Sequence, residues 1–156
     1  MAYCIGFGTR DVLEVCQTIK LTSAELYHYF AVLFKDDKHS FQFWLNTAMN
    51  EENQGRLCGL LIKLCRKNNF GTIQVELQEA EITLFYIQSL IGRAKKNPPS
   101  LKEALHLAID LETKMEAFRT ENIFIFSDQS IENSFLAIAN IDTKRLELLH
   151  QAYDRA

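Results

Sequence analysis

Proline is nearly absent from this sequence, and other scarcities exclude whole classes of protein. Only two prolines occur among 156 residues, side by side at Pro98 and Pro99. Because proline interrupts helices, this distribution leaves room for long helices on both sides of the pair. No apolar run approaches the roughly 20 residues of a membrane-spanning helix, so we expect no membrane partner. The 17 basic residues do not exceed the 20 acidic ones, and the net charge is −3, so we expect no nucleic-acid partner.

Motifs of common reactive or metal-binding sites are also lacking. The four cysteines form no C-x-x-C pair, which leaves zinc-ribbon, rubredoxin-like and thioredoxin-like readings without support. Cys58 and Cys65 are two helical turns apart, and we expect them to be small core residues in a reducing compartment. The glycines form no phosphate-binding loop, and no serine or cysteine has the sequence context of a nucleophile. The first residues, "MAYCIGFGTRD", lack the pattern of an export signal, so we expect a cytoplasmic protein.

Apolar residues recur at helical spacing along nearly the whole chain, which predicts an all-α fold. The length and the 47% apolar content are typical of one globular domain, here residues 1–156. Polar turns interrupt the pattern at "KDDKHS" (35–40), "KNNFG" (67–71) and "KKNPPS" (95–100), where Ser100 can cap the following helix. The segment "TIQVEL" (72–77), at the start of the third predicted helix, is compatible with a short strand. The predicted helices are 10–34, 41–67, 77–92, 101–120 and 130–154.

The lengths of the connections predict how these helices pair. Helices 10–34 and 41–67 are joined by a tight turn and should be antiparallel neighbours, as should 101–120 and 130–154. Residues 68–98 separate the two pairs and carry a helix of their own. We therefore predict a four-helix bundle with one long crossover; the alternative is an irregular five-helix bundle. The apolar link "NIFIF" (122–126) must either pack beneath the crossover or form a dimer contact.

Polar residues occupy core positions in this predicted bundle. Asp142 and Arg145 lie on the apolar stripe of helix 130–154, three residues apart and so on one face. The two helix pairs also resemble each other: "AMNEENQ" (48–54) aligns with "ANIDTKR" (139–145), and "TIKL" (18–21) aligns with "AIDL" (108–111). If a pseudo-two-fold axis relates the pairs, the matched positions meet in one polar layer. Its members are Thr22, Glu51, Gln54, Glu112, Asp142 and Arg145.

With these motifs the chain resembles the ferritin-like superfamily, and most closely the rubrerythrin family. That family places a Glu on the first and third helices and a Glu-x-x-His on the second and fourth, which together hold two iron ions. The resemblance is carried by "FWLNTAMNEENQ" (43–54), "LHLAIDLETKMEAF" (105–118) and "LAIANIDTKRLELL" (136–149), and it covers most of the chain except 68–98. It implies that Glu112 stands in the place of a bridging carboxylate, and that Glu51 and Asp142 stand in the two Glu-x-x-His glutamate places.

The departures from the family pattern predict that the iron site is lost. Thr22 replaces one glutamate, and Gln54 and Arg145 replace both histidines. Glu25, one turn beyond Thr22, is a possible substitute carboxylate but would restore no nitrogen ligand. Arginine carries a permanent positive charge, which repels a metal cation. We predict that Arg145 now neutralises the buried acids and that removing it would be costly.

The expected function follows from this degenerate site. We expect a non-catalytic ferritin-like protein with a structural or interaction role, no catalytic residues and no cofactor. The alternative is a metal-binding oxidoreductase that uses iron and peroxide chemistry at an atypical, carboxylate-rich site. Ferritin-like bundles often dimerise, so we expect a homodimer; no protein partner is identified. Glu147-x-x-His150 has the spacing of a metal pair, but its place on the helix predicts an exposed pair.

Overall fold

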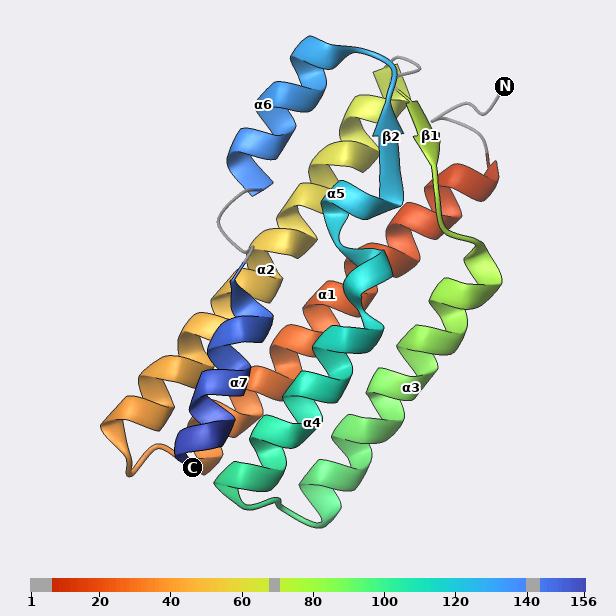
Figure 1. Ribbon diagram of the computed structural model, residues 1–156. Coiled ribbons are helices and arrows are strands. Elements are labelled where there is room, and N and C mark those ends of the chain that lie inside the picture. The colour runs from red at the N-terminus through yellow and green to blue at the C-terminus, as the bar shows by residue number, and fades with distance from the viewer. Residues whose placement is uncertain (1–6, 68–70, 140–143) are drawn as a thin grey trace.

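The computed structural model describes residues 7–67, 71–139 and 144–156, which form an all-α fold with one small β-ribbon (Figure 1). The helices are α1 (Phe7–Leu33), α2 (Lys38–Lys67), α3 (Leu77–Lys96), α4 (Leu101–Lys114), α5 (Thr120–Ile123), α6 (Gln129–Ala139) and α7 (Arg145–Arg155), with a 3₁₀ turn η1 (Glu116–Phe118) after α4. The strands β1 (Gly71–Ile73) and β2 (Phe124–Phe126) pair antiparallel, with Thr72 opposite Ile125. Within the described residues, no helix has the length and apolarity that crossing a membrane requires.

α1 and α2 form the long antiparallel hairpin that the turn at 35–40 predicts. α2 begins three residues earlier than predicted, because the Asp37 carboxylate accepts hydrogen bonds from the His39 N–H (3.1 Å) and the Ser40 hydroxyl (2.9 Å). The Ser40 hydroxyl is the main cause that lowers the pKa of Asp37. Further along, Gly59 leaves room for the Gln17 side chain, which donates to the Gly55 carbonyl at 3.2 Å. The two helices therefore approach closely along their whole length.

The crossover carries the additional helix that the sequence predicts. α3 packs along α1, and the Tyr29 hydroxyl donates to the Ala94 carbonyl at 3.2 Å. α3 extends to Lys96, four residues beyond its predicted end, and the Pro98–Pro99 turn then reverses the chain. The predicted Ser100 cap is confirmed: Ser100 and Glu103 form a reciprocal capping box at the start of α4.

Two predicted helices in the second half are wrong in extent. The helix predicted at 101–120 ends at Lys114, because the chain must leave the helix for β2 to pair with β1. The helix predicted at 130–154 is instead two helices, α6 and α7, and 140–143 lies outside the described residues.

The apolar link at 122–126 packs within the chain. Ile123 and Phe124 are buried, the Phe124 ring lies 4.8 Å from that of Phe126, and Phe126 lies 5.2 Å from Phe135 on α6. Ile125, on the other face of β2, is 59% exposed. The link therefore contributes strand β2 to the β-ribbon, which lies at one end of the molecule (Figure 1).

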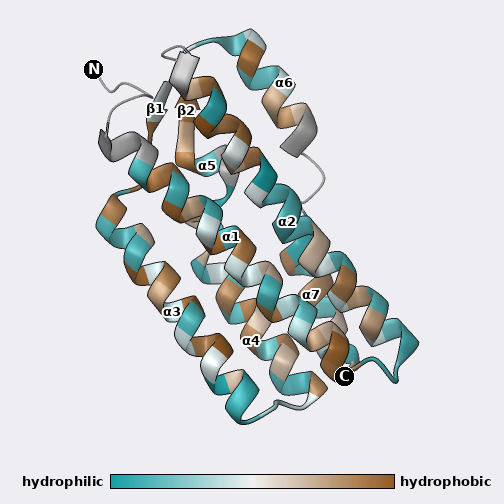
Figure 2. Cartoon of the chain, turned by 180° about the vertical axis from the view of Figure 1, so that it is seen from behind, coloured by the Kyte–Doolittle hydropathy of each residue, from teal (hydrophilic) through white to brown (hydrophobic). Residues whose placement is uncertain are grey.

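An aromatic cluster forms part of the core between α1 and α2. The rings of Tyr27 and Trp44 stack at 5.9 Å, and the Phe30 ring meets Trp44 edge-on at 4.9 Å. Hydrophobic stretches recur along α1 and alternate with hydrophilic ones (Figure 2). α1 packs against both α2 and α3, so residues on a wide arc of α1 are buried.

Candidate functional site

A buried polar cluster lies where α1, α2, α4 and α7 meet. Its members are Lys20 and Tyr27 from α1, Glu51 from α2, Glu112 from α4 and Arg145 from α7. Lys20 and Glu51 are each 2% exposed and Arg145 is 7% exposed, whereas Glu112 is half-buried. The apolar spacing of the four helices turns these positions inward. Gln54, one turn after Glu51 on α2, is also buried at 3% exposure.

Two carboxyl groups lie next to each other in this cluster. Burial is the main cause that raises the pKa of Glu112 well above its ordinary value, and the neighbouring negative charge and hydrogen bond of Glu51 raise it further. The positive charges of Arg145 and Lys20 oppose this shift without cancelling it. Glu112 therefore binds a proton more tightly than an exposed glutamate does, and this favours the hydrogen bond between the Glu112 and Glu51 carboxyl groups.

Tyr27 completes the hydrogen bonding of Glu112. Its hydroxyl donates to Glu112 Oε1 at 3.0 Å. Burial is the main cause that raises the pKa of Tyr27, and the charges of Glu112 and Glu51 add to the rise. Tyr27 therefore remains a neutral hydrogen-bond donor over the physiological pH range and does not act as a phenolate.

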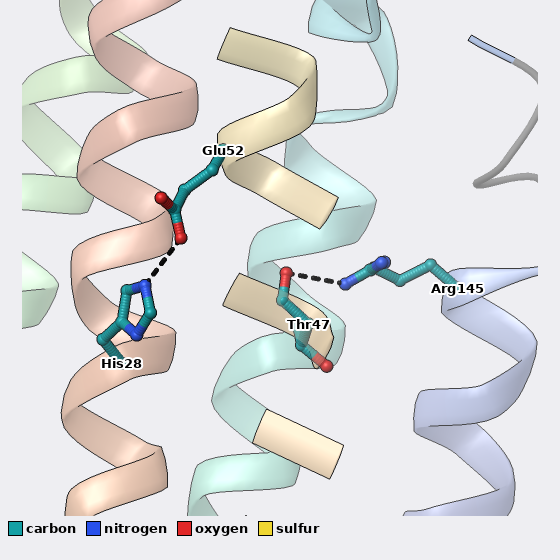
Figure 3. A network of polar contacts seen from close by, with 4 residues as sticks. All are labelled: His28, Thr47, Glu52 and Arg145. Atoms are coloured by element: carbon teal, nitrogen blue, oxygen red, sulfur yellow. Dashed lines mark hydrogen bonds and ion pairs between the residues drawn. The ribbon is translucent and has the colours of Figure 1, made fainter. Parts of the chain in front are cut away.

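Arg145 brings a permanent positive charge into the cluster from the first residue of α7. Its Nη1 donates to the Thr47 carbonyl oxygen of α2 at 3.1 Å. The charge lies close enough to lower the pKa of both Glu112 and Tyr27. Figure 3 shows α2 between two contacts: Arg145 meets Thr47 on one side, and Glu52 meets His28 of α1 on the other.

The other residues of the predicted polar layer lie in different surroundings. Thr22 is half-buried on α1. Glu25, the possible substitute ligand, lies at the surface, where Lys95 of α3 donates to its carboxylate at 3.2 Å. Asp142 lies outside the described residues. The structure therefore brings Glu51, Glu112 and Arg145 together, with Gln54 on the same buried side of α2.

Sequence reasoning missed Lys20 and Tyr27. The available signal is their spacing: Lys20, Ser23 and Tyr27 lie at i, i+3 and i+7, which places them on one helix face. Ser23 is fully buried on that face, and its hydroxyl donates to Ile19 O at 2.8 Å.

The histidines lie away from this cluster. His28 Nε2 lies 2.7 Å from Glu52 Oε1. His106 lies 3.4 Å from Asp110 on the outer face of α4. Glu147 and His150 are both exposed, as their place on the helix predicts.

The metal-ligating side chains among the described residues do not fit a di-iron centre. Across 7–67, 71–139 and 144–156, no group of three or more His, Cys, Asp or Glu side chains lies together as a metal site would require. In the cluster itself, Glu51 and Glu112 bond to each other, and Arg145 and Lys20 place two cations beside them. A di-iron site instead needs several ionised carboxylates and open positions.

Two further observations bear on the chemistry of the core. Cys16 and Cys58 are buried free thiols, and burial raises the pKa of each to about 12. They therefore stay protonated and unreactive, as expected for small core residues.

Among the described residues, Trp44 Nε1 and Glu51 Oε2 are buried without a hydrogen-bond partner. Glu51 Oε2 is thus an acceptor in the polar cluster that the described protein groups leave unsatisfied.

Comparison with known proteins finds no matching family model, no similar curated protein and no matching solved structure.

Proposed function

We propose that this chain is a ferritin-like, rubrerythrin-like four-helix bundle in which a buried polar cluster has replaced the di-iron centre. Its role is then structural or interaction-based, without catalysis. In this assignment α1 and α2 form the first helix pair, α4 with α6 and α7 forms the second, and α3 lies in the crossover. The proposal rests on the sequence motifs of α2 and α4 and on the residues that gather between them.

One observation carries the proposal: Arg145, only 7% exposed, lies beside the hydrogen-bonded carboxyl groups of Glu51 and Glu112. A buried arginine is costly unless it is paired and hydrogen-bonded. The carboxyl groups of Glu51 and Glu112 attract the guanidinium, which also donates a hydrogen bond to Thr47 O. The charge that metal ions would supply in the ferritin-like site is here supplied by a side chain.

Restoring the family ligands tests this proposal. In protein from iron-supplemented cells, we expect far less than one iron per native chain by mass spectrometry of metals. The variant Thr22→Glu, Gln54→His, Arg145→His should gain iron, because it removes the cation and adds a carboxylate and two imidazoles. The control variant Thr113→Glu, Gln88→His, Arg56→His makes the same changes at exposed positions and should gain none. A folded first variant without iron would refute the assignment of these positions.

The second candidate function is a metal-binding oxidoreductase with an atypical, carboxylate-rich site. The observation that favours it is Glu51 Oε2, a buried carboxylate oxygen without a partner among the described residues. A carboxylate oxygen of this kind can coordinate a metal cation, or it can accept a hydrogen bond from a water molecule. About two iron atoms per native chain, together with reactivity toward peroxide, would favour this candidate over the first.

We also propose that the protein is a cytoplasmic homodimer, as ferritin-like bundles often are. Sedimentation equilibrium of the full chain should then give twice the chain mass of 18.0 kDa. A monomer at micromolar concentration would contradict this part of the proposal and leave the assignment of the polar cluster unaffected.

A further inference from the structure

A groove lies where α3 turns into α4. This turn is at the end of the molecule away from the β-ribbon (Figure 1). The volume of the groove is about 540 Å³, and the groove lies between the last turns of α3, the first turns of α4 and Tyr153 of α7. Its apolar walls are Leu90, Ala94, Pro99 and Leu107. The volume is within the range of about 300–1,000 Å³ that small-molecule sites occupy.

Basic side chains line the same groove. Arg93 comes from α3, and Lys102 and His106 come from α4. Tyr153 positions two of them: Lys102 Nζ lies 4.9 Å from the centre of its ring, and the His106 ring lies 6.1 Å away. Positively charged side chains from α3 and α4 therefore lie beside the same apolar surface.

The acidic residue that lines the groove does not fully neutralise these cations. The Glu103 carboxylate accepts from the Ser100 backbone N–H at 3.2 Å, and the Ser100 bonds are the cause that lowers its pKa. Glu103 stays ionised while it caps α4, so it offsets one of the two positive charges of Arg93 and Lys102 and leaves the other. On a chain with net charge −3, this leaves a local excess of positive charge next to apolar surface.

We propose that this groove binds a small organic acid, with its carboxylate between Arg93 and Lys102 and its hydrocarbon part along Leu90, Ala94 and Leu107. The arginine fork matches a carboxylate through two parallel hydrogen bonds. The apolar walls add affinity that a bare inorganic anion cannot gain. This site is separate from the polar cluster and does not depend on the proposed function.

Calorimetric titration of the full-length protein with octanoate tests the site. Octanoate should bind saturably at one site per chain, about tenfold more tightly than octan-1-ol, which has the same chain without the charge. Methyl signals of Leu90 and Leu107 should shift in NMR spectra as octanoate is added. Absence of saturable binding, equal affinity for octan-1-ol, or shifts confined to other methyl groups would each overturn the proposal.

Charge variants separate recognition in the groove from general attraction of anions. Arg93→Gln with Lys102→Gln should weaken octanoate binding by about tenfold or more. Both side chains are exposed, so the fold should persist, as circular dichroism will verify. The control Lys63→Gln with Lys96→Gln removes the same charge at exposed positions outside the groove and should leave affinity unchanged. An equal loss in the control, or full competition by inorganic phosphate, would show that the groove does not recognise the organic acid.

Discussion

Replacing Arg145 by methionine removes the buried cation while keeping a long, flexible apolar side chain. The change removes the bond to Thr47 O, and a hydrogen bond from a charged group contributes about 1.5–3 kcal/mol. It also leaves the Glu51–Glu112 pair without its nearest arginine. Removing one partner of a buried ion pair costs about 3–5 kcal/mol in all, a large part of a typical total of about 5–15 kcal/mol. We expect this loss in the free energy of unfolding, measured by urea titration with circular dichroism.

Two further variants make this prediction specific. Arg155→Met removes the same side chain at an exposed position of the same helix, where Nε donates to Gln151 O at 3.2 Å, and should cost no more than about 0.5 kcal/mol. Adding Glu51→Gln to Arg145→Met removes one of the acids that the arginine faced and should restore about 1–2 kcal/mol. If Arg145→Met and Arg155→Met lower the free energy of unfolding equally, the guanidinium does not neutralise the acids and the reasoning fails.

Three further predictions follow from the contacts described above. The pKa of Glu112 is raised in the folded state, so the folded chain keeps a proton that the unfolded chain releases above its ordinary pKa of 4.5. The free energy of unfolding should therefore fall as the pH rises above about 4.5 toward the raised pKa, and Glu112→Gln should flatten this slope; a rise over that range in the native protein would contradict the raised pKa. Tyr27→Phe removes the donor to Glu112 Oε1 and should cost about 0.5–1.5 kcal/mol in urea unfolding, whereas an unchanged midpoint would mean that water replaces the hydroxyl without loss. Gly71→Ala should lower the melting temperature, because its Cβ would lie 1.9 Å from the Ile125 carbonyl oxygen, whereas Gly92→Ala, with nothing within 4 Å, should add about 0.5–1 kcal/mol through helix propensity. The reverse order of the two glycine variants in a calorimetric melt would mean that β1 and β2 do not pair as described.

The helices of the first half could be predicted closely because local signals mark their ends. Asp37 and Ser100 cap α2 and α4, and the adjacent prolines end the crossover helix. The second half could not be predicted as well, because tertiary pairing decides it. The pattern from Leu101 to Thr120 is helical throughout, yet Phe124–Phe126 pairs with Gly71–Ile73, and no local signal reports a partner about 50 residues away.

The polar cluster could be predicted in part for a similar reason. Glu51, Gln54 and Arg145 stand out because a charged or amide group interrupts an apolar stripe. Lys20 does not stand out, since a lysine on a long helix is ordinarily exposed. It is buried here because α1 packs against both α2 and α3 and has little solvent-facing surface at that level. The apolar periodicity of one helix identifies one buried face. It does not indicate that a second face is buried against another helix.

The place of Arg145 in its own helix gives an independent argument for its role. As the first residue of α7, it puts a positive charge at the positive end of the helix dipole, which costs about 0.3–1 kcal/mol. Lys144, the residue before it, makes no side-chain cap. Local helix stability would therefore select against this arginine. Its contacts lie across the bundle instead, at Thr47 O and beside the acid pair of α2 and α4. The residue is thus explained by the charge of the buried cluster, which the Glu51→Gln addition tests directly.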